Sequence, residues 1–431
     1  MMTPSFGWLD LSDSEQRRAR EYLRQFRTEG TLDELGFGIV RDALADVFFP
    51  ATNTIMTHSR YLFFVAAALL RVERERLSGG QAARRLKMLE DELRKILSRD
   101  SASEDDAEKN YGVIGALAKD NLRRYPSSIY WNALKRLGLF KRPEWGLTYY
   151  LGHLDDYYKL IAPKRDDDKT SHPPLAPTHN WDPGLNDVFS STTGLSLNDG
   201  FSPKLDFGLG PAEAGYLTAR FQALAQCQGP SLLAHLLARQ HQSPFAFPWE
   251  VPCPDTLKPL VNHARAFSMF AKGATLQYYD LLIEERKAQG WSSPVDGFEQ
   301  PFAEWWSQTR ETLAVWDLRD FLDLIKKKCR TRPNDAPFLT RWLKMCLEAK
   351  DGASLLRDPD ARRLVINREK AVRPVKHRIG QEKYLRQWDP QKSLEGAEYT
   401  DPQRLPYLLD FRSYIGGVFV REVVAGLKQK P

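Results

Sequence analysis

The chain has 431 residues, of which 42% are hydrophobic and 27% are charged, and its formal net charge is +6. This composition is typical of a soluble globular protein with two or three domains, and it excludes an intrinsically disordered chain. The four cysteines form no CxxC pair, which argues against a zinc site built from cysteines. No apolar run reaches the roughly 20 residues of a membrane span, and nothing resembles a secretory signal, so we expect a cytoplasmic protein.

The first 162 residues predict an N-terminal helical domain. Capping boxes at residues 12–15 and 31–34 each place a Ser or Thr three residues before a Glu, a pattern that begins helices. Two long helices are expected at residues 60–76 and 81–99. In the second of these, apolar residues recur at steps of three and four, which predicts one buried face.

Residues 111–145 have the outline of a helix-turn-helix, with a candidate wing after it. We expect a first helix at residues 113–122, a tight turn at 123–126, and a second helix that Ser127 caps and Gly138 closes. Six cations flank the second helix, and we assign them to phosphate contacts: Arg123, Arg124, Lys135, Arg136, Lys141 and Arg142. The alternative is an ordinary helical core, because two helices and a turn occur throughout α proteins.

Residues 163–210 differ sharply in composition from what precedes them, since they are rich in Pro, Asp, Ser and Gly. This predicts a linker between domains. The triplet Asp166–Asp168 lacks the alternating ligand spacing of a calcium loop, so it is interpreted as part of the linker. A second helical domain is then expected over residues 211–431, with its longest helices at 257–289, 302–330, 337–350 and 407–427.

The strongest charge signal lies between residues 362 and 386, where nine basic residues meet two acidic ones. The second group of phosphate contacts is assigned here: Arg362, Arg363, Arg368, Lys370, Arg373, Lys376 and Arg378. Interleaved valines and isoleucines favour a short strand or strand pair. A solvated surface or a subunit contact accounts for the same charges equally well.

The sequence contains no recognisable active-site motif. The chain has no P-loop, no GxSxG elbow, no HExxH helix and no HxK pair. Glu348-Ala349-Lys350, with Asp323 or Asp335 upstream, has the letters of a metal-dependent nuclease but lies in an expected helix instead of a strand. His153 and Asp156 share a helical face but lack a third ligand. We therefore assign no catalytic residue, no metal site and no cofactor.

Several stretches resemble an uncharacterised family of bacterial proteins of similar length. They are FGWLDLSDSE near the N-terminus, ELGFGIVRDALADVFFPATNTIMTHSRYLFF, YPSSIYWNALKRLGLF and the closing LLDFRSY. Members of that family are often encoded beside helicase-like and phospholipase D-like proteins in regions linked to phage defence. The resemblance implies a subunit of a defence complex that acts near DNA, and it provides no catalytic residues to transfer.

The sequence thus predicts a mainly α-helical, multi-helical protein of two domains with a Pro-rich linker. The expected function is non-enzymatic: duplex DNA binding through phosphates, or an adaptor role, beside helicase-like and nuclease-like subunits of an antiphage complex and away from membranes. Two alternatives remain. One is a scaffold that binds only proteins, and the other is a metal-dependent nuclease with a site of dispersed carboxylates.

Overall fold

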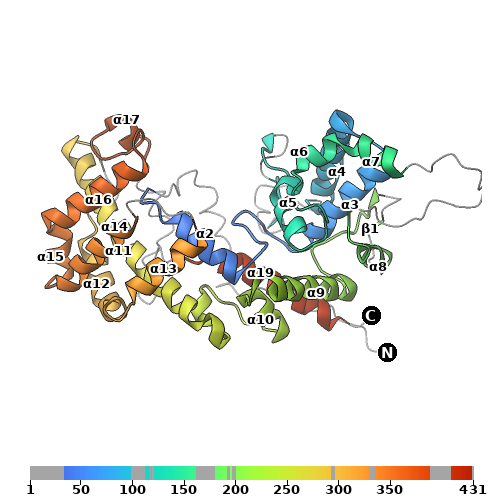
Figure 1. The fold of residues 1–431 in the computed structure, drawn as a ribbon. Coiled ribbons are helices and arrows are strands. Elements are labelled where there is room, and N and C mark those ends of the chain that lie inside the picture. Colours follow the sequence, from blue (N-terminus) through green and yellow to red (C-terminus); the bar gives the residue numbers. More distant parts are fainter. Residues whose placement is uncertain are drawn as a thin grey trace, which may run out of the picture. The chain divides into compact units, whose positions relative to one another are not determined.

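The computed structural model describes residues 34–98, 112–116, 118, 121–161, 180–191, 195–196, 200–292, 297–329, 335–388 and 409–429. Within these ranges the chain is mainly helical, which confirms the predicted fold class (Figure 1). The strands named in the same ranges are β1 (Leu195–Ser196) and β2 (Gly200–Phe201), which pair antiparallel. The expected capping box at 12–15 lies outside the described residues, as does the start of the box at 31–34.

The chain divides into two compact units, each built from segments that are distant in the sequence. Unit 1 consists of Met1–Ala45, Phe247–Trp249 and Asp255–Phe411. Unit 2 consists of Asp46–Ala246, Glu250–Pro254 and Arg412–Pro431. This division differs from the predicted boundary at 163–210, because the helices that follow this stretch belong with the helices that precede it.

Unit 2 is organised around α3, a helix that is buried on every side. Its helices are α3 (Tyr61–Arg74), α4 (Gly79–Leu97), α5 (Pro126–Arg136), α6 (Leu147–Gly152), α7 (Leu154–Ile161), α8 (Leu185–Ser191), α9 (Pro211–Gln228), α10 (Leu232–Ala238) and α19 (Ser413–Lys428). Every residue of α3 from Tyr61 to Glu73 is buried, as expected for a helix that is apolar all round. The amphipathic helix predicted at 81–99 is α4, which packs its apolar stripe against α3.

The C-terminal helix α19 lies along α9 within unit 2 (Figure 1). Gly426 allows this close approach, and Gly416 allows α19 to approach Phe49. A Cβ on Gly416 would lie 2.1 Å from Cδ1 of Phe49, and a Cβ on Gly426 would lie 2.9 Å from the carbonyl oxygen of Leu209. Residues 412–429 therefore belong to unit 2 together with α9 and α10, whereas residues 255–411 of the domain predicted at 211–431 belong to unit 1.

The described part of the predicted linker is packed into unit 2. Trp181 is 1% exposed, and its Nε1 donates to the Glu73 carboxylate at 3.0 Å. Phe140 and Trp181 form an antiparallel bridge, so this segment is tied to the chain just after α5. The Asp166–Asp168 triplet lies outside the described residues.

Unit 1 is organised around α11, a helix of 31 residues. Its helices are α11 (Lys258–Ala288), α12 (Glu299–Ala314), α13 (Leu318–Lys328), α14 (Asp335–Glu348), α15 (Gly352–Arg357), α16 (Pro359–Val372) and α17 (Glu382–Leu385). The 3₁₀ turn η4 (Asp255–Leu257) precedes α11, the turn η3 (Pro248–Glu250) lies earlier, and α2 (Gly38–Phe48) begins in unit 1. Phe37, just before α2, packs edge-on against Phe267 of α11 at a centroid distance of 5.8 Å.

The strand predicted within residues 362–386 is wrong, because the segment begins as helix α16. Asp358 caps this helix by accepting from the N–H groups of Asp360 and Ala361, and Pro359 follows at the first helical position. Ala361 and Val365 are buried four residues apart, which is helical spacing. The helix predicted over 302–330 is likewise interrupted, because Asp317 caps a new helix, α13.

Candidate nucleic-acid interface

The second helix of the expected helix-turn-helix is present as α5. Tyr125 precedes it in an extended conformation and Pro126 occupies its first turn, where the fixed φ of proline suits a helix start. Ile129 and Leu134 are buried on the predicted apolar face. Gly138 follows the helix with φ of +70°, which confirms its predicted place at the helix end.

The first helix of that motif is not found among the described residues 112–116, 118 and 121–122. Residues 112 and 114–116 form turns. Gly112 and Gly115 have φ of +77° and +85°, which interrupts a right-handed helix. The prediction of a helix at 113–122 is therefore wrong over these residues, and residues 117, 119 and 120 lie outside the described part of the chain.

Ser127 anchors α5 to α4 and does not cap it. Its N–H and Oγ donate to the two oxygens of the Glu90 carboxylate at 2.5 and 3.2 Å. Burial raises the pKa of Glu90 to about 7, although the hydrogen bonds from Ser127 act in the opposite direction. This contact fixes the start of α5 beside α4.

Three cations gather at the start of α5, and we call them the N-terminal cations: Lys87, Arg123 and Arg124. All three are exposed. The Lys87 ammonium, on α4, lies 5.6 Å from the centre of the Tyr125 ring, which brings it to the same end of the helix. The described residues provide no carboxylate that pairs with any of the three.

Three further cations gather at the other end, and we call them the C-terminal cations: Lys135, Lys141 and Arg142. Lys135 donates through Nζ to the carbonyl oxygen of Pro143 at 3.0 Å, which places it beside the turn that carries the other two. Lys141 and Arg142 are exposed. In the part of the chain that the structure describes, none of these three forms an ion pair.

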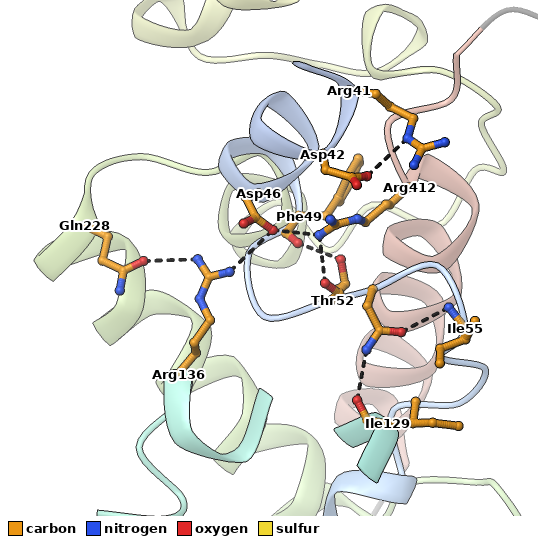
Figure 2. Close-up of polar contacts among 11 residues, drawn as sticks. Arg41, Asp42, Asp46, Phe49, Thr52, Ile55, Ile129, Arg136, Gln228 and Arg412 are labelled. Atoms are coloured by element: carbon orange, nitrogen blue, oxygen red, sulfur yellow. Dashed lines mark hydrogen bonds and ion pairs between the residues drawn. The ribbon is translucent and has the colours of Figure 1, made fainter. Parts of the chain in front are cut away.

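Arg136 differs from its neighbours because it is bound to other side chains of unit 2. Figure 2 shows the Asp46 carboxylate between the guanidinium groups of Arg136 and Arg412, at 3.4 and 2.6 Å. Arg136 also donates to the amide oxygen of Gln228 at 3.3 Å. A guanidinium held in this way stabilises the packing of α5 and is poorly placed to contact a phosphate.

The basic segment in unit 1 is largely an internal ion-pair network. Arg368 is buried, donates to the carbonyl oxygen of Leu35 at 2.7 Å, and lies 2.7 Å from the Asp335 carboxylate. Arg378 is also buried and pairs with Glu34. Burial raises the pKa of Glu34, and the charge of Arg378 opposes this shift. These arginines hold the first described residues of the chain against α16 and the loop after it.

The other members of this segment are divided between paired and exposed side chains. Arg362 pairs with Glu284, and Arg363 pairs with Asp360 one helical turn away. Arg373 lies 3.8 Å from Glu34. Lys370 and Lys376 are exposed, and no ion pair of theirs occurs among the described residues. The sequence showed the excess of cations but not the acids that neutralise them, because Glu34 and Glu284 are far away along the chain.

The acidic residues that match a nuclease motif in the sequence do not lie close together in the structure. Asp335 pairs with Arg368, whereas Glu348, at the opposite end of α14, pairs with Lys344 at 3.6 Å. Asp323 pairs with Lys326 on α13. In the described ranges, no group of three or more His, Cys, Asp or Glu side chains is arranged to hold a metal ion.

Residues 3–158 match a family described as a "family of unknown function" (DUF6361). The match covers 156 of the 431 residues, and it includes α5 with both groups of cations. It supports the resemblance of this part of the chain to an uncharacterised family. No curated protein and no solved structure matches the chain. Of the helices that the structure describes, none is long and apolar enough to cross a membrane.

A polar cluster at the start of α3, within the matched region, was not predicted from the sequence. Ser59 donates through its N–H and Oγ to one oxygen of the Glu422 carboxylate at 2.7 and 2.6 Å, and His58 contacts the other oxygen. Arg60 is buried and pairs with Glu213 at 3.0 Å. These contacts fix α9 and α19 to α3. A run of four residues with polar or ionisable side chains at 57–60, just before an apolar helix, was the available signal.

Proposed function

We propose that the chain binds nucleic acid through the phosphate backbone, using the cations at both ends of α5. One observation carries this proposal: six cations surround α5, and no carboxylate among the described residues neutralises them. Unpaired cations that lie close together repel one another unless a bound polyanion neutralises them. Lys and Arg are the usual phosphate contacts in protein–nucleic acid interfaces.

The dimensions of α5 support a backbone contact. Its 11 residues span about 16 Å. The N-terminal and C-terminal cations are therefore separated by a length comparable to the roughly 12 Å width of the DNA major groove. Two groups at this separation suit phosphates on opposite sides of a groove, so duplex DNA is a suitable ligand.

The wider role in this proposal is that of a non-enzymatic DNA-binding or adaptor subunit of a bacterial antiphage complex. It rests on the resemblance of the stretches quoted above, which implies helicase-like and nuclease-like partner subunits. In unit 1, the proposal keeps Arg363, Lys370 and Lys376 as exposed secondary contacts. The buried Arg368 and Arg378 are assigned to the stability of unit 1.

The test is a salt-dependent binding measurement with charge-reversal variants. Six phosphate contacts predict that log Kobs falls with log salt at a slope of about −5 on duplex DNA. The triple variant Arg123→Glu, Arg124→Glu, Arg142→Glu should bind a labelled 20-base-pair duplex at least about tenfold more weakly, with a slope reduced by about 3. Fluorescence anisotropy at several salt concentrations gives both quantities.

Two matched variants give the comparison. Reversal of Arg363, Lys370 and Lys376 tests the secondary contacts in unit 1. Reversal of Lys326, Lys327 and Lys328, exposed at the end of α13, is the control with the same change of charge. The proposal fails if this control weakens binding as much as reversal around α5, because binding would then follow net charge alone.

A scaffold that binds only proteins is the second candidate. Large apolar side chains that are strongly exposed favour it, namely Val315 at 84%, Val375 at 71% and Met88 at 62%. Recovery of partner subunits in a pull-down after nuclease treatment, without any DNA shift by the purified chain, would establish this role in place of DNA binding.

A further inference from the structure

An aromatic row lies directly after the C-terminal cations in unit 2. It consists of Trp145, Tyr149 and His153, which are spaced four residues apart along and beside α6 and so share one face. The ring centres of Trp145 and Tyr149 are 5.4 Å apart. The rings of Tyr149 and His153 are stacked, with centres 3.9 Å apart and planes inclined by 20°.

The row faces solvent, unlike the aromatic side chains beside it. Tyr149 is 48% exposed, and no hydrogen bond of its hydroxyl group occurs among the described residues. The next residue, Tyr150, is buried, and its hydroxyl group donates to Glu73. Tyr150 therefore has a structural role that Tyr149 lacks. An exposed ring of this size outside the buried core is typical of a binding surface.

Cations adjoin one end of the row. The Arg142 guanidinium lies 5.7 Å from the centre of the Trp145 ring, and Lys141 precedes it on the same turn. Trp145 is held in place because its carbonyl oxygen accepts from Nε1 of Trp131 at 3.1 Å. At the other end, beyond His153, Asp155 and Asp156 are exposed acids. Phosphates are therefore favoured at the Arg142 end, where two cations outnumber one exposed acid, Glu144.

We propose that this aromatic row is a stacking platform for unpaired bases, with Lys141 and Arg142 holding the adjoining phosphates. Exposed aromatic rings beside cations are typical of single-strand recognition, whereas a duplex keeps the faces of its bases within its own stack. The preferred ligand is then a single strand, or a duplex with an unpaired end. This inference rests on the proposed nucleic-acid binding and specifies the form of nucleic acid.

The experiment compares three labelled probes of equal length with the full chain: an oligo(dT) strand, an abasic strand with the same phosphates but no bases, and a duplex. We expect oligo(dT) to bind more tightly than the abasic strand. The substitution Tyr149→Ala should weaken oligo(dT) binding by about 5- to 150-fold, the effect of losing one stacked base, and leave abasic binding unchanged. Tyr149→Phe, which keeps the ring, should bind as the parent chain does.

Controls separate the inference from the proposed function. Met88→Ala removes another exposed apolar side chain, on α4, and should change nothing. If Tyr149→Ala does not fold, His153→Ala tests the same platform. Equal binding of oligo(dT) and abasic strands, unaffected by either substitution, would overturn the platform and leave phosphate binding intact. Failure of all three probes to bind would overturn both. Competition by poly-glutamate as efficient as by unlabelled oligo(dT) would overturn the platform in favour of an acidic protein partner.

Discussion

Glu90 is the residue whose protonation should matter most for the proposed interface, because it anchors the start of α5. Its folded pKa of about 7 lies above its ordinary value of 4.5 because the carboxyl group is buried. The folded state therefore binds this proton more tightly than the unfolded state does. The stabilisation is complete below about pH 4.5 and is lost as the pH rises through about 7.

Glu90→Gln should remove this pH dependence. The amide oxygen can still accept from the N–H of Ser127, and the side chain stays neutral at every pH. We expect the variant and the parent chain to be similarly stable at pH 4.5 to 5, and the variant to be more stable at pH 8 by up to about 3 kcal/mol, the equivalent of the pKa difference. Urea unfolding followed by circular dichroism at both pH values measures this. Parallel stability profiles of the two proteins would contradict it.

The placement of single residues shows where sequence reasoning succeeds and where it ends. Exposure of Arg123, Arg124 and Arg142 could be predicted, because they lie in polar turns beside a helix with one clear apolar face. The ion pairs of Arg136 and Arg378 could not be predicted, because each arginine pairs with a carboxylate from a distant segment. The partner of Arg378, Glu34, is 344 residues away. Local charge counts contain no information about such partners.

At the scale of the helices, the close packing of α19 against its neighbours depends on glycines, which have no Cβ atom. Gly416→Ala adds a methyl group that would overlap the Phe49 ring. Overpacking of this kind costs about 1 to 3 kcal/mol, which exceeds the roughly 1 kcal/mol that alanine adds through helix propensity. We expect a net loss of stability in unit 2, measured by urea unfolding.

Gly215→Ala is the matched control in α9, the helix against which α19 packs. A Cβ at position 215 meets nothing within 4 Å, so the gain in helix propensity should remain and stabilise the unit by about 0.5 to 1 kcal/mol. Opposite signs for the two glycine substitutions are the expected result. A stabilising Gly416→Ala would mean that α19 does not pack as described.

Helices with long continuous or periodic runs of apolar residues were predictable, whereas short segments that mix apolar and charged residues were not. The buried helix α3 and the stripe of α4 follow from their sequences, because continuous or periodic apolar residues leave few alternatives. The basic segment was expected to be a strand because of its valines and isoleucines. It is helical because Asp358 caps it and Ala361 and Val365 are four residues apart. Within the helix expected at 113–122, Gly115 has a φ of +85°, which a right-handed helix does not accommodate.

At the scale of the whole molecule, each unit depends on segments from both halves of the chain. Unit 2 includes α19, whose Glu422 binds Ser59 and whose preceding residue Arg412 binds Asp46. Removal of residues 412–431 should therefore expose the core of unit 2 and abolish the proposed nucleic-acid binding, while unit 1, which ends at Phe411, persists. Limited proteolysis with mass spectrometry should show new cleavage within residues 46–246. Continued protection of α5 in the shortened chain would contradict this dependence.

The distance along the chain between Ser59 and Glu422 also bears on how the protein is made. At ordinary translation rates, roughly 20 to 70 s separate the synthesis of these two residues, which lie 363 positions apart. During that interval the start of α3 lacks its hydrogen bonds to the Glu422 carboxylate. Helix α5 then belongs to a unit that has not finished folding. The proposed affinity for nucleic acid would thus be acquired only after Glu422 has been synthesised, so nascent chains that lack this residue would not compete for the same ligand.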